Sequence, residues 1–455
     1  MNQNKKSLFV TADGTNLAFT FILVSSLFLL WGFCNGMIDV MDKHFQEELH
    51  LTLAQSANVQ WAHYLGYFLM ALPAGWMATK LGYKGGIIAG LLMVAAGGLW
   101  FIPATHIAQF WAFLVGVCFI AAGLTFLETI ANPYTTVLGP TQFAATRINL
   151  AQSCNGIGWI FGPIAGSMFF YGKDAAGKST GTETLWIPYA GVAVVVIILA
   201  VIFYFADVPD IKAEDDYHLD EATPGASRSI WTHPHFVMAV AAQFFYIAAQ
   251  AGIFAFFINY MTSQTPGIPE SWNSFLRAGW LETGADGVLH ISNAFASILA
   301  SGGFVCFLLG RFTGAALLKK FSAHRMLGLY GILNVVACLL IFAKLGWVSV
   351  ACVFMSYFFM SIMFPTIFAL GIFGLGARAK KASSFIVMAI MGGAILPKLM
   401  GSIADKTDIS RGFIVPAFCF AFVAFYGFNW SRFSRAESLN GTKIVGGIEN
   451  PSPKQ

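Results

Sequence analysis

A single glutamate interrupts an apolar stretch of the sequence that runs from Gln109 to Gly139. Glu128 lies near the middle of this run, and Asn132 follows four residues later, on the same face if the run is helical. Pro133 removes the backbone N–H that would otherwise bond to the Thr129 carbonyl. An ionisable residue inside a membrane segment is by default a functional-site hypothesis, so we expect Glu128 to act in function. The alternative is a structural kink in which a neutral acid packs against a neighbouring helix.

Further polar residues share helix faces within the first half of the chain. Trp31, Asn35 and Asp39 follow one another at intervals of four residues, and Gln152 and Asn155 lie three residues apart. Such a set suits a sugar, because amides and carboxylates bind hydroxyl groups and an aromatic ring packs on the apolar face of the sugar ring. The competing interpretation is that single amides among them form hydrogen-bonded contacts between helices; such contacts need only a pair of residues, so they explain the whole set less well.

The second half carries one comparable stripe and two isolated cations. Gln243, Tyr246 and Gln250 share one face of a predicted helix and are candidate substrate-binding residues. Arg311 lies toward the end of its apolar run, where pairing with a loop acid or with helix-end carbonyls is favoured over substrate contact. Lys398 either extends its amine toward the membrane surface or provides the counter-charge of an acid in the first half.

Composition places the chain among membrane proteins. Of its 455 residues, 57% are hydrophobic and only 11% are charged, whereas about a quarter of the residues of soluble domains are charged. The formal net charge of +4 comes without a clustered basic face, so no nucleic-acid partner is expected. Seven cysteines fall within apolar runs without paired spacing or a histidine cluster, so we expect no disulfide framework, no metal site and no cofactor.

Runs of about 20 apolar residues predict an all-α membrane protein with twelve transmembrane helices in two six-helix bundles. We expect an N-terminal bundle at 1–206, a cytoplasmic linker at 207–234, a C-terminal bundle at 235–435 and a cytoplasmic tail at 436–455. Lys and Arg are more numerous in the loops on the side of the termini, which predicts that both termini are cytoplasmic. The expected spans are 18–41, 58–79, 85–104, 109–137, 147–171, 186–206, 235–262, 291–318, 326–343, 347–373, 383–403 and 412–432.

The two halves share features at corresponding positions. The fourth span carries Pro133 and the tenth carries Pro365, while the fifth and eleventh contain Pro163 and Pro397, each before a Gly-Ser pair. Such a duplication is typical of transporters that alternate access around a site between their repeats. The insertion at 262–290 is expected to form an outer loop or cap.

The sequence blocks that carry these residues also resemble a known family. They resemble the fucose–galactose–glucose proton symporters of the major facilitator superfamily, from the first predicted span to the eleventh. The blocks are Trp31–Asp39, Leu127–Pro133, Val137–Pro140, Asn149–Gln152 with Asn155, Gly310–Gly314, Phe364–Phe368 with Leu370–Ile372, and Ser383–Met388 with Gly392 and Gly393.

This resemblance implies a central cavity between two bundles and uptake of a monosaccharide coupled to proton movement. It also implies that Asp39 and Glu128 are the functional carboxylates, and that Gln152 and Asn155 line the cavity. The first span departs from the fucose permease pattern, which is rich in asparagine, because Gly36 and Ile38 stand there. The choice among L-fucose, galactose and glucose therefore stays open.

Other functions remain to be weighed against proton-coupled sugar uptake. Asp39 and Glu128, with neighbouring amides and carbonyls freed near Pro133, could instead bind a sodium ion. An intramembrane enzyme would need a nucleophile beside a base or a metal cluster at helical spacing, and the sequence shows neither arrangement. A channel would be expected to show rings of charge or repeated carbonyl loops, which the sequence also lacks. We expect a non-enzymatic, monomeric, multi-pass protein of a bacterial inner membrane.

Overall fold

The structure is a computed structural model that describes most of the chain. Side chains at some helical positions, including Asn132, Pro133 and Asn149, lie outside this description, as do most of the predicted linker and all of the predicted tail. The described residues are 8–10, 14–139, 144–171, 184, 186–209, 229–269, 271, 276, 279–284, 287–318, 321–373, 375 and 379–434.

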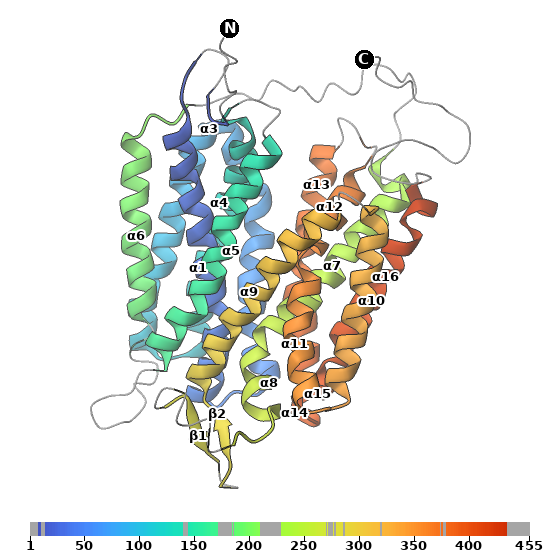
Figure 1. Cartoon of the computed structure of the whole chain (residues 1–455). Helices are drawn as coiled ribbons and strands as arrows, with labels where there is room; N and C mark the ends of the chain where they lie inside the picture. The colour runs from blue at the N-terminus through green and yellow to red at the C-terminus, as the bar shows by residue number, and fades with distance from the viewer. Residues whose placement is uncertain are drawn as a thin grey trace.

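Helices account for nearly all of the described structure (Figure 1). The first half contains α1 (Ala18–Glu48), α2 (Leu53–Ser56), α3 (Asn58–Ile107), α4 (Phe110–Val137), α5 (Ala144–Phe170) and α6 (Trp186–Phe205). The second half contains η3 (Ile230–Thr232), α7 (Pro234–Ala255), α8 (Phe257–Gln264), β1 (Leu281–Thr283), β2 (Leu289–Ile291), α9 (Asn293–Leu317), α10 (Ala323–Phe342), α11 (Trp347–Met360), α12 (Met363–Ile372), α13 (Ala379–Met388), η6 (Ala389–Met391), α14 (Gly392–Lys406), α15 (Ile409–Gly412) and α16 (Ile414–Ser434).

The helices match the predicted spans once the breaks within several spans are taken into account, among them the breaks at Phe256 between α7 and α8 and at η6 between α13 and α14. Gly82 adopts φ 68°, a left-handed value that favours glycine, and divides the 50 residues of α3 into the second and third spans. The tenth span divides into α11 and α12, and Pro365 falls in the first turn of α12, where a missing N–H breaks no helical bond. Within the described residues, ten stretches are long and apolar enough to cross a membrane. The first part of α3 and all of α5 occupy the two remaining predicted positions.

The helices form two groups that lie side by side (Figure 1). In one group, α1 packs on α5 and α3 packs on α4 and α6; in the other, α7 packs on α12, α14 and α16, and α10 packs on α11 and α16. We call the end where α1 begins and α16 ends the terminal end, and the opposite end, which carries β1 and β2, the hairpin end.

Glycines bring α1 and α5 into close contact and thereby orient the polar face of α1. A side chain at Gly158 of α5 would collide with the Leu29 carbonyl, and one at Gly32 of α1 would collide with the Asn155 backbone. Small residues allow membrane helices to approach closely, because there is no hydrophobic driving force between them in lipid. This contact fixes the rotation of α1 about its axis, so that the adjoining stripe with Trp31 and Asp39 meets α3.

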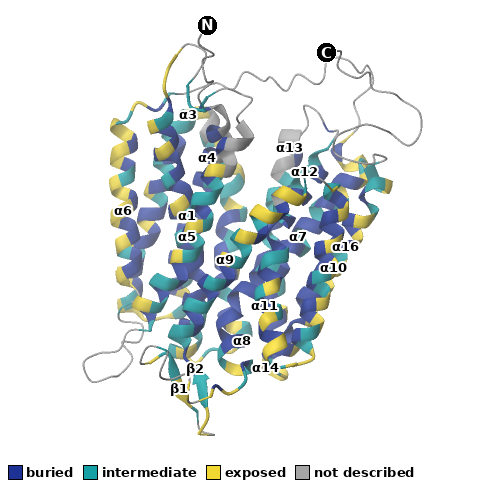
Figure 2. Ribbon diagram, viewed as in Figure 1, coloured by how far each residue is buried: buried dark blue, intermediate teal, exposed yellow. Residues whose placement is uncertain are grey.

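The exposed surface of the helices is apolar, as expected for a face in contact with lipid. Figure 2 shows exposed positions along the outer face of α6. They include Ile198, which is 54% exposed, and Phe205, which is 80% exposed. Exposed aliphatic and aromatic side chains over a whole helix face indicate contact with hydrocarbon rather than water.

The insertion between the seventh and eighth predicted spans contains more structure than a loop. Residues Thr262–Gln264 complete α8, and β1 pairs with β2 as an antiparallel hairpin with Glu282 opposite His290. The sequence predicted an outer loop or cap at 262–290 and did not indicate this hairpin. The strands are only three residues long and lack strong alternation, so the sequence carried little signal for them.

Hydrogen bonds connect the two groups from the hairpin end to about the middle of the molecule. The Asp405 carboxylate accepts from the backbone N–H groups of Leu53 and Ala54, at 2.7 and 2.9 Å. Deeper inside, Ser297 donates to the Pro163 carbonyl at 2.7 Å. Further bonds of this kind are Gln46–Asn259, Glu47–Asn293, Asn58–Lys398, Ser167–Ala294 and Ile160–Ser301. The hairpin end is therefore held closed between the groups.

Candidate functional site

The predicted stripe on α1 faces the first part of α3. The Trp31 indole N–H donates to the Tyr67 hydroxyl at 2.6 Å, and the Asn35 side chain lies beside the same hydroxyl. Asn35 is buried, and its Oδ1 has no hydrogen-bond partner among the described residues. An aromatic ring, an amide and a phenol thus come together, and they offer both stacking and hydrogen bonds.

Asp39 lies on the same face of α1, eight residues after Trp31. The Gln60 amide donates to Asp39 Oδ1 at 2.8 Å, and only 8% of Asp39 is exposed. The second carboxylate oxygen is buried and has no partner within the described part of the chain. Gln60 therefore fixes the orientation of Asp39 and leaves one oxygen for a proton or a ligand.

Glu128 approaches this region from α4, and Tyr64 interacts with both acids. Tyr64 is close enough to interact electrostatically with Asp39, Glu128 and Tyr246, which belong to α1, α4 and α7. Glu128 is half-buried, although the residues before it are buried. Gly393 of the second group packs against the Tyr64 ring and has no side chain to displace it. Tyr64 thus contacts both groups of helices.

The second group contributes Tyr246 and, behind it, Arg311. The Tyr246 hydroxyl donates to the Met360 carbonyl at 3.1 Å, at the break between α11 and α12. The Arg311 guanidinium donates to the adjacent Ser361 carbonyl at 3.5 Å, stacks on the Phe307 ring at 5.0 Å and interacts with Tyr246. Arg311 thus makes the helix-end contact that its position in the sequence favoured.

Four other predicted residues occupy different surroundings. Gln243 is fully buried, and neither polar atom of its amide has a partner among the described residues. Gln250 lies two turns further along the same face of α7 and is half-buried. Asn155 is also buried, and its amide donates to the Phe28 carbonyl at 3.2 Å, so in this state it connects α5 to α1. Gln152 is half-buried on α5.

Of the two remaining predicted residues, Lys398 does not come to the central site, and the Asn132 side chain is not described. Lys398 is exposed, and its amine donates to the Asn58 amide oxygen at 3.3 Å, so the contact that the structure gives it is with an amide rather than with an acid. The side chain of Asn132 lies outside the described residues.

Sequence reasoning missed three site residues, all on the first part of α3. Gln60, Tyr64 and Tyr67 are spaced by four and three residues, so they share one helix face. This spacing was a usable signal for a polar stripe. Only the packing of α3 against α1 shows which residues the stripe meets.

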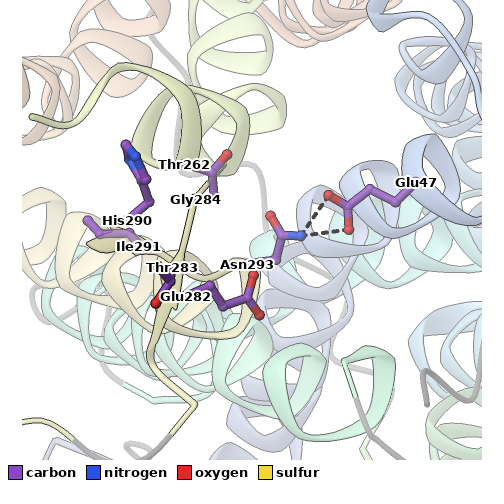
Figure 3. A pocket seen from close by; sticks show the side chains of 8 residues that line it. All are labelled: Glu47, Thr262, Glu282, Thr283, Gly284, His290, Ile291 and Asn293. Atoms are coloured by element: carbon purple, nitrogen blue, oxygen red, sulfur yellow. Dashed lines mark hydrogen bonds between the residues drawn. The ribbon is translucent and has the colours of Figure 1, made fainter. Parts of the chain in front are cut away.

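A pocket of about 270 Å³ opens at the hairpin end, away from this site (Figure 3). Its lining includes Glu47, Glu282, His290 and Asn293, and the Asn293 amide donates to both oxygens of Glu47 at 2.6 Å. Within the described residues, no group of three or more His, Cys, Asp and Glu side chains could hold a metal ion.

Two kinds of sequence comparison identify the family. A model of the Major Facilitator Superfamily matches residues 20–285. The L-fucose-proton symporter of Escherichia coli strain K12 is 34% identical over 438 residues, which cover 92% of this chain and 94% of that protein. A glucose/galactose transporter of Brucella abortus is 30% identical over 423 residues, which cover 93% of this chain and 96% of that protein.

Solved structures agree with this assignment. The crystal structure of the major facilitator transporter FucP in the outward conformation is 32% identical, covers 91% of this chain and 99% of its own, and has a TM-score of 0.63. A D-xylose-proton symporter has a TM-score of 0.66 at 12% identity and supports the fold alone. The chain therefore belongs to the major facilitator superfamily, in the family that contains these L-fucose-proton symporters and glucose/galactose transporters.

Proposed function

We propose that this protein imports a monosaccharide together with a proton by alternating access, with Asp39 and Glu128 as the proton-coupling residues. The family and its relatives are transporters rather than enzymes, in agreement with the prediction. Relatives named as an L-fucose-proton symporter and a glucose/galactose transporter support this class of substrate and this coupling ion.

The observation that carries the proposal is the meeting of two acids and both groups of helices at Tyr64. Asp39 arrives from α1, Glu128 from α4 and Tyr246 from α7. A site between two groups changes its surroundings whenever one group rotates against the other. Protonation of an acid at such a site can therefore be linked to which side of the membrane the site faces.

The chemistry around these acids supports a monosaccharide. Trp31 provides an indole face, while Asn35, Tyr67 and Tyr246 provide amide and phenol groups that suit sugar hydroxyls. We include Gln152, Asn155, Gln243, Gln250 and Asn132 as further substrate-binding candidates. In the present state Asn155 bonds to the Phe28 carbonyl, so its contribution requires that this bond be released when substrate binds.

We further propose the orientation of the protein in the membrane. The bundles are 1–206 and 235–435, joined by a cytoplasmic linker, and both termini lie in the cytoplasm of a bacterium. The hairpin end then faces outward, so the closed hairpin end corresponds to an inward-facing state. We propose that one chain in the inner membrane suffices for transport.

Uptake into proteoliposomes tests this function. Labelled L-fucose, galactose, glucose and mannose are offered separately, with either a proton gradient or a sodium gradient imposed. We expect one of the first three sugars to accumulate under an inwardly directed proton gradient and not under a sodium gradient. Accumulation under sodium alone would support the alternative, in which the same carboxylates bind a sodium ion.

A further inference from the structure

A second carboxylate on α1 has no role in the site described above. Asp42 lies three residues beyond Asp39 toward the hairpin end, and only 1% of it is exposed. Both of its carboxylate oxygens are buried without a hydrogen-bond partner among the described residues. The Ser56 hydroxyl lies beside Asp42 but donates to the Leu53 carbonyl instead.

The surroundings of Asp42 extend from Asp39 to the pocket at the hairpin end. Asp39 and Lys43 interact with it along α1, and Tyr171, just after α5, interacts with both Asp42 and Glu47. The buried Tyr171 hydroxyl also lacks a partner among the described residues, and His44 packs against its ring. Glu47 lines the pocket in Figure 3. Acidic groups therefore follow α1 from the pocket inward, over about 12 Å at 1.5 Å per residue.

A purely structural role explains Asp42 poorly. A polar group that holds helices together needs a partner, whereas an ionised carboxylate buried without hydrogen bonds is strongly destabilising. Lys43 makes its described ion pair with Glu47, at 3.1 Å, rather than with Asp42. The Asp42 carboxyl is therefore best accommodated here with a proton bound.

We infer that Asp42 is a proton-relay residue, which receives a proton from the hairpin side and passes it to Asp39. When the hairpin end opens, water in the pocket reaches Glu47 first, then Asp42, then Asp39. In the relay step, the O–H bond of Asp42 breaks as an O–H bond forms on Asp39, without any redox change. This inference rests on the proposed proton-coupled function.

Transport by Asp42 variants in proteoliposomes tests the relay. In Asp42→Asn, we expect the initial rate of uptake driven by a proton gradient to fall about 100-fold, the low end of what a positioned proton-transfer group contributes. Exchange of labelled for unlabelled sugar at equal pH needs no net proton transfer, so it should continue at the parent's rate. Asp42→Glu should recover gradient-driven uptake, and Glu48→Gln on the same helix serves as the matched control.

Two transport results would overturn the inference. Parental gradient-driven uptake in Asp42→Asn would show that the proton does not pass through Asp42. Loss of sugar exchange in both Asp42→Asn and Asp42→Glu would show that the residue acts through packing.

Infrared spectroscopy separates a failure of the relay from a failure of the proposed function. If the parent shows no proton-driven uptake, the proposed function is wrong, but the protonation of Asp42 is still measurable. We expect the parent at neutral pH to show a carboxylic acid C=O band that is missing in Asp42→Asn and retained in Glu48→Gln. An unchanged band in Asp42→Asn would mean that Asp42 is ionised, and the relay would then be excluded.

Discussion

At the scale of residues, the central site depends on pairs of polar side chains from α1 and α3. Trp31 bonds to Tyr67, and Gln60 bonds to Asp39. The α1 members of these pairs, Trp31 and Asp39, were predictable, because with Asn35 between them they follow at intervals of four residues and so share one helix face. The partners on α3, Tyr67 and Gln60, also share one helix face by their spacing, but only the packing of α3 against α1 shows which residue each of them meets.

The Trp31–Tyr67 bond predicts a measurable coupling in sugar affinity. Trp31→Phe and Tyr67→Phe each remove the same hydrogen bond, so the double variant should lose less affinity than the sum of the two single losses. The coupling expected for one neutral bond is about 0.5–1.5 kcal/mol. Binding calorimetry with the transported sugar measures all four proteins. Strictly additive losses would mean that the bond does not shape the binding site.

Asp42 illustrates what a sequence reading overlooks at this scale. The predicted first span ends at residue 41, one position before Asp42, whereas α1 continues in the structure to Glu48. A carboxylate one position beyond a predicted boundary looks like a loop residue. Its burial follows from the contacts of α1 with α2 and α5, which hydropathy does not describe.

At the scale of elements, the contact of α14 with α2 holds the hairpin end closed. Asp405 accepts two backbone N–H groups at the start of α2, where an acid is also favoured by the helix dipole. Asp405→Ala removes two hydrogen bonds to a charged group, each worth roughly 1.5–3 kcal/mol. The population open at the hairpin end should then rise at least about tenfold, since 1.4 kcal/mol corresponds to that factor.

Distances between spin labels across the hairpin end measure this population. Labels at the exposed positions Trp186 and Leu345 report on the two groups, in a background without the native cysteines. Ser402→Ala is the matched control, because the Ser402 hydroxyl bonds only within its own helix in the contacts described, to the Lys398 carbonyl. An unchanged distance distribution in Asp405→Ala would show that this contact does not control closure.

Asp408, in the connection between α14 and α15, should make the stability of the fold depend on pH. Asp408 begins α15 by accepting the N–H groups of Ser410 and Arg411, and it pairs with Lys344 at 2.8 Å. Partial burial acts to raise the pKa of Asp408, but the hydrogen bond and charge of Lys344, with the two amides, hold it below its ordinary value. The folded protein therefore releases this proton more readily than the unfolded chain does.

The sign of the effect on stability follows from this depressed pKa. The contribution of Asp408 is complete above the unfolded pKa of about 3.9 and is lost as the pH falls through the lower folded value. Asp408→Asn keeps a good N-cap and removes the charge. The parent in detergent should therefore melt at a higher temperature than Asp408→Asn above about pH 5, and the difference should shrink below about pH 4. A difference that is constant with pH would contradict this account.

Helix positions were predictable, whereas breaks and strands were less so. Long apolar runs define the spans because the membrane requires about 20 such residues. The boundary between α11 and α12 falls four residues before Pro365. The proline therefore indicates which span is broken, but it does not give the position of the break. The hairpin of β1 and β2 depends on three paired residues and could not be predicted.

At the scale of the whole molecule, the duplicated features of the sequence correspond to two groups of helices that meet at one end. The sequence predicts the groups, but which end is closed depends on contacts between residues far apart in the chain, such as Asp405 and Leu53.

The central claim is that sugar and proton cross together through the site of Asp39 and Glu128. The most direct measurement records the external pH of lightly buffered proteoliposomes, without an imposed gradient, when labelled sugar is added outside. We predict that the parent takes up sugar and raises the external pH, since each sugar brings a proton inward. Asp39→Asn and Glu128→Gln should still exchange sugar but leave the external pH unchanged. Sugar uptake by the parent with no change in pH, or a full pH change in both variants, would contradict the account.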